Sequence, residues 1–77
     1  MDRGNMDQKL RLKPSEPIHD AFYDPETERL TIQFAKGGTS AHHGVPQKLA
    51  QGLQTASSHG TFYNEHIRGK FEHSKVR

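Results

Sequence analysis

The chain has 77 residues, 30% of them hydrophobic, and it contains no cysteine. A chain of this length forms one domain with a small core, and without cysteine it builds neither a disulfide nor a thiolate metal site. Its 11 Lys and Arg residues exceed its 9 Asp and Glu residues by two, a milder surplus than that of a typical nucleic-acid-binding arm. Its apolar runs are far too short to cross a bilayer, and the residues after Met1 do not have the apolar pattern of a signal peptide. The sequence therefore predicts a cytoplasmic protein.

The first 16 residues have the composition of a segment that precedes a folded domain. Residues 1–16 mix both signs of charge and have only Met6, Leu10 and Leu12 as apolar anchors. Such a composition favours flexibility. We therefore expect a flexible segment over residues 1–16 and a single domain over residues 17–77.

The clearest strand pattern runs from Arg29 to Phe34. Leu30, Ile32 and Phe34 alternate there with polar residues, which is typical of a strand with one buried face.

Turn signals on both sides of this strand predict two further strands. Residues 24–28 begin with Asp-Pro, which favours a turn, and residues 36–38 end in Gly-Gly, which permits positive φ. We therefore expect a strand over residues 18–23 and another over residues 39–43.

Two helices are expected after the strands. Pro46 is suited to the first turn of a helix, although Gly52 would destabilise the interior of this helix by about 1 kcal/mol relative to Ala. Residues 57–60 break the helical pattern, and Ser58 can cap a second helix there. Residues at helical spacing mark both segments, Leu49, Leu53 and Ala56 in the first and Phe62, Tyr63, His66 and Ile67 in the second.

This order of elements defines the expected fold class. Three strands followed by two helices predict an α+β domain, with a three-stranded antiparallel sheet and both short helices packed on one face. A small barrel-like closure of the strands is the alternative. The expected core consists of Tyr23, Leu30, Ile32, Phe34, Val45, Leu49, Leu53, Phe62, Ile67 and Phe71.

Nothing in the sequence favours catalysis. There is no cysteine nucleophile and no Gly-x-Ser-x-Gly elbow, and Gly37-Gly38 lacks the Lys-Ser/Thr of a phosphate-binding loop. Ser57 and Ser58 lie beside His59, but neighbours in sequence rarely form a nucleophile–base pair, so we interpret them as helix-break residues. We expect no enzymatic activity and no cofactor.

Six histidines raise the question of a metal site. His42 and His43 are adjacent, so on a strand they point to opposite faces. His59, His66 and His73 recur every seven residues, but Gly60 and Gly69 interrupt any single helix that would align them. No spacing matches a known zinc motif, and we expect no metal.

The carboxy-terminal stretch has the ingredients of single-strand nucleic-acid binding, which are cations for phosphates and rings for bases. Its basic residues are Arg68, Lys70, Lys75 and Arg77, interleaved with Tyr63, His66, Phe71 and His73. The alternative is that the phenylalanines belong to the core and the basic residues only keep the carboxy-terminal stretch soluble. Glu65 and Glu72 also weaken the positive electrostatic potential of this stretch.

Protein binding needs no special residues. A short sheet has two edges whose unpaired N–H and C=O groups can accept an added strand. Residues 39–43 contain neither Pro nor Lys to block such pairing.

The chain resembles the KTSC domain family from about Ser15 to Lys75. The matching features are Tyr23-Asp24, Leu30-x-Ile32-x-Phe34, the glycine turn, Gly44-Val45-Pro46, Ala56-x-Ser58-x-Gly60, Phe62-Tyr63-Asn64 and Ile67-Arg68. Family members usually carry Tyr-x-Tyr before Gly-Val-Pro, where this chain has Ser40-Ala41-His42. The family occurs at the end of some lysyl-tRNA synthetases and as small stand-alone bacterial or phage proteins.

The resemblance implies binding rather than catalysis, with RNA as the expected partner class. It implies structural roles for Tyr23 and Ile67 and surface contacts for Asn64 and Arg68. Our first hypothesis is a module that contacts RNA or ribonucleoprotein machinery through Asn64, His66, Arg68 and Lys70, with His42 as a remaining flat ring. The alternative is a small regulator that docks on RNA polymerase or another component of the transcription and translation machinery.

Overall fold

The structure, a computed structural model, describes residues 8–13 and 17–76. Five strands and two helices follow one another along these described residues. They are β1 (Gln8–Lys9), β2 (Ile18–Asp24), β3 (Arg29–Phe34), β4 (Thr39–His43), α1 (Gln47–Thr55), α2 (His59–His66) and β5 (Glu72–Lys75).

The strands form one antiparallel sheet in the order β1-β2-β3-β4-β5. The α+β class and the two helices are confirmed, but the expected number of three strands is wrong, because β1 and β5 extend the sheet at both edges. The two edge strands do not pair with each other, so the described sheet is open and not a barrel. β4, which we expected at an edge, lies inside the sheet.

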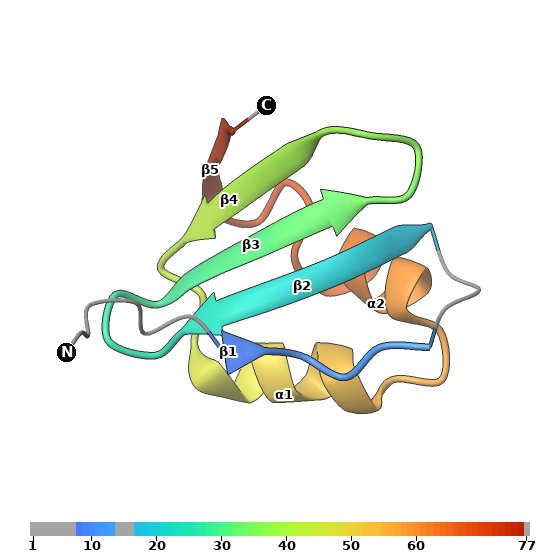
Figure 1. Cartoon of the computed structure of the whole chain (residues 1–77). Coiled ribbons are helices and arrows are strands. Elements are labelled where there is room, and N and C mark those ends of the chain that lie inside the picture. Colours follow the sequence, from blue (N-terminus) through green and yellow to red (C-terminus); the bar gives the residue numbers. More distant parts are fainter. Residues whose placement is uncertain (1–7, 14–16, 77) are drawn as a thin grey trace, which may run out of the picture.

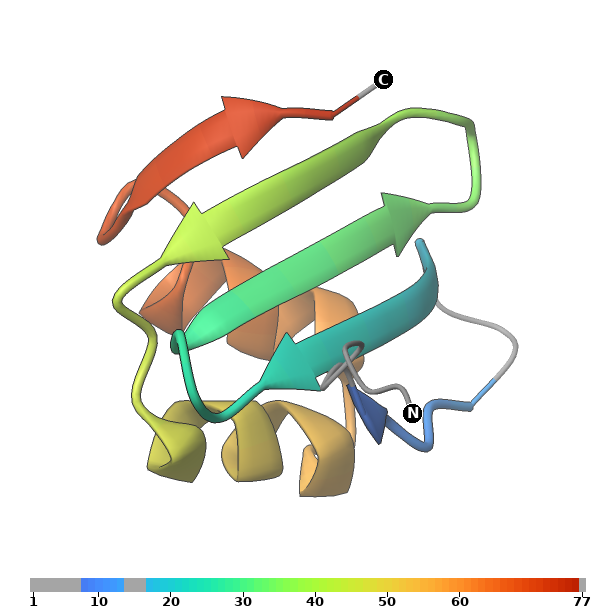
Figure 2. The same cartoon turned by 60° about the vertical axis from the view of Figure 1, so that its left-hand side comes forward.

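Both helices cover the same face of the sheet, and the other face is left uncovered by any described element (Figures 1 and 2). The register explains which residues point inward. Ala21 pairs with Ile32 and Tyr23 with Leu30, and all four are at most 2% exposed. The alternation predicted for β3 therefore does set the buried face of the sheet.

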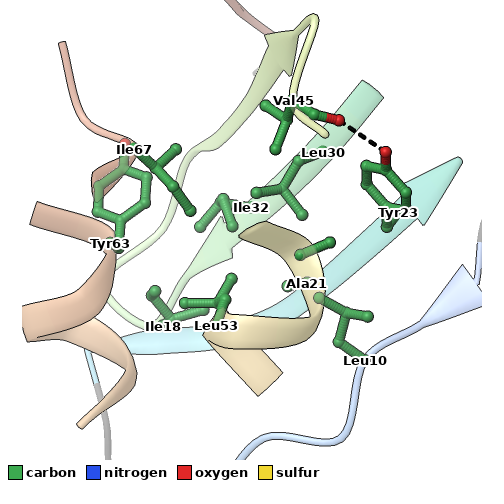
Figure 3. Packing of buried hydrophobic residues seen from close by; sticks show 11 residues of the cluster. Leu10, Ile18, Ala21, Tyr23, Leu30, Ile32, Val45, Leu53, Tyr63 and Ile67 are labelled. Atoms are coloured by element: carbon green, nitrogen blue, oxygen red, sulfur yellow. Dashed lines mark hydrogen bonds between the residues drawn. The ribbon is translucent and has the colours of Figure 1, made fainter. Parts of the chain in front are cut away.

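The core lies between this face and the helices (Figure 3). Its buried members are Leu10, Ile18, Ala21, Tyr23, Leu30, Ile32, Val45, Ala50, Leu53, Tyr63 and Ile67, with Leu12, Phe34, Leu49, Phe62 and Phe71 partly buried around them. The phenylalanines thus surround the core more than they fill it.

A buried hydrogen bond holds the connection between β4 and α1. The Tyr23 hydroxyl donates to the Val45 carbonyl oxygen at 2.6 Å (Figure 3). Burial raises the pKa of Tyr23, and Glu28 and Asp24 raise it further, so the phenol stays protonated and can donate at neutral pH. The structural role expected for Tyr23 has a physical basis in this contact.

Residues 8–13, which we expected to belong to a flexible segment, are packed. Gln8 and Lys9 pair with Tyr23 and Phe22 of β2, and Leu10 is only 9% exposed. The rest of the expected segment, residues 1–7 and 14–16, lies outside the described residues.

The sequence signals for the amino-terminal ends of both helices are confirmed. Pro46 precedes α1, and the Ser58 side chain caps α2 by accepting a hydrogen bond from the Thr61 N–H at 3.3 Å. Neither helix of the described chain is long and apolar enough to span a membrane.

Gly52 allows the two helices to approach closely. A Cβ atom at this position would lie 2.7 Å from Cζ of Phe62. We expect Gly52→Ala to lower the free energy of unfolding by about 1 kcal/mol, because the displaced ring costs more than the gain in helix propensity. In a Phe62→Ala background the same change should become stabilising by up to about 1 kcal/mol. Urea denaturation of the four proteins in this cycle measures the reversal, and an unchanged sign would contradict the steric account.

Candidate binding surface at the end of α2

Three of the predicted contact residues lie together at the carboxy-terminal end of α2 and in the following turn. Asn64, Arg68 and Lys70 are all exposed. Arg68 Nη1 lies 3.5 Å from Asn64 Oδ1, although Arg68 itself lies two residues beyond the end of α2. We call these three residues the α2 surface.

The local fold explains why these side chains are presented to solvent. Ile67 is fully buried, and the N–H groups of Ile67 and Arg68 both donate to the Tyr63 carbonyl oxygen, at 2.9 and 2.8 Å. The helix therefore ends with Ile67 directed into the core and Arg68 directed away from it. Gly69 then adopts φ +73°, which turns the chain towards β5 and leaves Lys70 exposed.

His66 lies on a different flank of the helix. Its ring contacts Phe62, with centroids 4.5 Å apart, and its Nε2 lies 4.0 Å from Glu65 Oε1. At 3.6 residues per turn, Asn64 lies on the opposite side of α2 from Phe62 and His66. His66 is exposed as expected, but it does not join the other three residues.

His42 is not available as a contact residue, and this prediction is wrong. Its position pairs with Leu30 of β3, so its side chain points to the helix-covered face, where it is 2% exposed. The Tyr63 hydroxyl lies 3.1 Å from its Nε2, and its Nδ1 is buried without a hydrogen-bond partner. Burial, together with the neighbouring His73 and His43, lowers the pKa of His42 to about 4, so the ring is neutral at pH 7.

His42 connects α2 with the edge of the sheet. Its ring lies 5.4 Å from that of Tyr63 and 5.6 Å from that of His73, measured between centroids. Burial raises the pKa of Tyr63, and the Arg68 guanidinium opposes this rise. The sequence indicated His73 only as a candidate metal ligand or base-stacking ring and not as a neighbour of His42, because nothing in Glu72–Lys75 marks a strand that pairs with β4.

The geometry gives no nucleophile–base pair at residues 57–59. Ser58 caps α2, while His59 is buried, with Nδ1 2.8 Å from the Leu53 carbonyl oxygen and Nε2 3.0 Å from the Lys13 N–H. A carbonyl oxygen only accepts, so Nδ1 carries the hydrogen and Nε2 accepts. Both ring nitrogens are therefore used by main-chain groups.

No set of three or more potential metal ligands is found among the described residues. One surface hollow of about 460 Å³ is lined by Lys9, Leu10, Arg11, Leu12 and Asp20. It contains one carboxylate, which forms an ion pair with Lys9 at 3.6 Å.

In chemical terms, the α2 surface offers hydrogen bonds and positive charge to an anionic partner.

The fold and the surface together define a small α+β domain, an open antiparallel sheet with one covered face and exposed polar residues at the end of its second helix. Comparison with known proteins identifies the family. The profile of the KTSC domain matches residues 14–71, and the chain belongs to the KTSC domain family. The crystal structure of a KTSC domain protein from Yersinia pestis is similar, with a TM-score of 0.83 and 35% identity, and the match covers 92% of this chain and 99% of that one.

Relatives differ greatly in length. A lysine–tRNA ligase of Nostoc punctiforme is 33% identical over 66 residues, which is 84% of this chain but only 12% of the ligase. A protein of Tsukamurella paurometabola is 33% identical over 57 residues, covering 74% of this chain and 85% of that protein. The chain therefore matches only a small part of the ligases and most of the shorter relative.

The position of the family's Tyr-x-Tyr motif can now be placed. Ser40 and His42 pair with Ile32 and Leu30, so both positions face the helices. The departure from the motif therefore removes no ring from the uncovered face of the sheet.

Proposed function

We propose that this KTSC domain is a non-enzymatic module that contacts RNA through the α2 surface, with His66 as a flanking contact. The observation that carries the proposal is that Asn64, Arg68 and Lys70 expose an amide, a guanidinium and an ammonium group within seven residues of chain, with the first two groups 3.5 Å apart. Such groups bind phosphate oxygens, and the amide can also bond to a base edge.

The relatives support RNA as the partner class. Matching segments occur within enzymes named lysine–tRNA ligase, which act on tRNA, so a domain retained there is exposed to RNA. The modest net charge of +2 favours a contact that assists a larger complex, such as ribonucleoprotein machinery, more than strong independent binding. A partner of this kind implies a cytoplasmic location.

Arg68→Glu is the sharpest test of this proposal. We expect the affinity for a short single-stranded RNA to fall about tenfold at low salt, because an attraction to phosphate becomes a repulsion. The slope of log affinity against log salt should also become less steep by about 0.7. Fluorescence anisotropy across a salt series measures both quantities.

Lys48→Glu provides the matched control, because Lys48 is exposed on α1 and undergoes the same charge reversal. It should leave the affinity within about twofold. Equal losses in both variants would show that only net charge matters, and no RNA retention by the unchanged chain would discard the proposal. Circular dichroism checks that both variants remain folded.

A second candidate function is protein interaction, for example a small regulator that docks on RNA polymerase or a translation component. The observation that favours it is the uncovered outer edge of β5, since no described strand pairs with it. This candidate needs no contribution from Arg68, so Arg68→Glu separates it from RNA binding.

A further inference from the structure

β5 is an edge strand with every residue exposed. Figure 2 shows it at the end of the sheet, next to β4 and with no described strand or helix on its outer side. It contains no proline, and its register with β4 is regular over four pairs, from Ser40–Lys75 to His43–Glu72. A regular, exposed edge can accept a further strand.

The register shows which main-chain groups face outward. The Val76 N–H donates to the Thr39 carbonyl oxygen at 2.7 Å. In an antiparallel pair, every second residue exchanges these bonds with its neighbour, so Val76, Ser74 and Glu72 direct their main-chain groups at β4. His73 and Lys75 therefore direct their N–H and C=O groups away from the sheet.

The same two residues carry the side chains that an added strand would meet. His73 and Lys75 pair with His42 and Ser40, so their side chains lie on the helix side of the sheet, and both are exposed. A residue hydrogen-bonded opposite either of them would place its side chain on that same side. Lys75 supplies positive charge there, and His73 adds to it when protonated.

We propose that the outer edge of β5 binds an extended acidic segment of a partner protein by strand addition. The favoured segment carries carboxylates at alternate positions, opposite His73 and Lys75. In an antiparallel arrangement the residue opposite Val76, whose side chain is 56% exposed, is apolar, and the residue opposite Glu72 is basic. The inference is independent of the RNA proposal, because it depends on main-chain groups of β5 and not on Arg68.

A second copy of this chain fits the edge less well. Two copies related by two-fold symmetry would pair β5 with itself in antiparallel orientation, and His73 or Lys75 would then face His73 or Lys75 of the other copy. Like charges at such positions are destabilising. Lys75 thus discourages self-pairing and favours an acidic strand.

The test uses a synthetic peptide, acetyl-Thr-Val-Glu-Thr-Glu-Lys-Thr-amide, and the chain labelled with ¹⁵N. We expect saturable shifts of the His73 and Lys75 amides and no binding by a peptide with both Glu residues replaced by Lys. Lys75→Pro and Lys75→Ala form the matched pair, because both remove the charge and only Pro removes the outward N–H. Proline is tolerated there because this N–H takes no part in the pairing with β4.

Lys75→Pro should bind the peptide about tenfold more weakly than Lys75→Ala, which corresponds to one lost hydrogen bond. The Val76 amide, which pairs with Thr39, reports whether β5 remains paired in both variants. Equal affinities of Pro and Ala variants with β5 intact would overturn strand addition, as would binding of the lysine peptide. Displacement of the peptide by single-stranded RNA would show that the site selects only for charge, and this result would also overturn strand addition. Arg68→Glu should leave the affinity for the peptide unchanged.

Discussion

Replacing His59 by Ala is expected to lower the free energy of unfolding by about 3 kcal/mol. His59 is 1% exposed, and its ring joins two main-chain groups that are far apart in sequence, the Leu53 carbonyl and the Lys13 N–H. Truncation leaves both groups without these bonds and opens a cavity. Such a loss is a large part of the stability of a small domain.

Urea denaturation followed by circular dichroism measures the loss, and amide exchange at Lys13 reports the second bond directly. His59→Asn is the informative intermediate, because its amide can donate to the Leu53 carbonyl but cannot reach Lys13. It should recover part of the stability and none of the protection at Lys13. His66→Ala, an exposed histidine on the same helix, should change the stability by no more than about 0.5 kcal/mol. A similar small change for His59→Ala would show that the ring is not the link described.

Local patterns in the sequence were sufficient for the elements that bury an apolar face. β3 was predicted because its apolar residues alternate, and the amino-terminal ends of α1 and α2 follow from Pro46 and Ser58. Each of these signals acts within a few residues of the chain, so it does not depend on the rest of the fold.

β5 could not be predicted in the same way. All four of its residues are exposed, so no apolar alternation marks the strand, and it forms because the turn after α2 brings the chain beside β4. β1 is similarly exposed. The two edges of the sheet therefore depend on tertiary position, and the expectation of three strands failed at these edges.

The error at His42 has a different origin. Ala41 and His42 are both buried, at 5% and 2% exposure, although strand neighbours point to opposite faces. A shift of one residue in the register would exchange their faces, and β4 has no apolar pattern that selects between them. Asn64 and Arg68, by contrast, are four residues apart on a predicted helix, and that spacing already places them side by side.

The neutral state of His42 should make the fold sensitive to acid. The pKa of His42 in the native fold is about 4, compared with 6.5 for the unperturbed side chain. Between these two values the unfolded chain binds the proton and the native chain does not, so stability rises with pH in this window and is lost as the pH falls below about 6.5. Between pH 7 and pH 4.5 the loss through His42 is about 2 kcal/mol.

His42→Gln isolates this contribution. Glutamine does not titrate, and its terminal amide lies near the position of Nε2, so it can keep the contact with the Tyr63 hydroxyl. We expect urea denaturation of this variant to show a loss between pH 7 and pH 4.5 that is smaller by about 2 kcal/mol than the loss in the unchanged chain. Comparing the two losses cancels the contributions of all the groups that the two proteins share.

His19→Gln is the matched control, because His19 is an exposed histidine on β2. It should retain nearly all of the acid sensitivity. If His42→Gln loses as much stability on acidification as the unchanged chain does, His42 does not reside in its buried neutral state. The contact between β4 and α2 would then differ from the one described, and with it the position of Tyr63 beside Arg68. Because all three proteins are compared by urea denaturation without any ligand, that outcome would test the packing beneath the α2 surface independently of any partner.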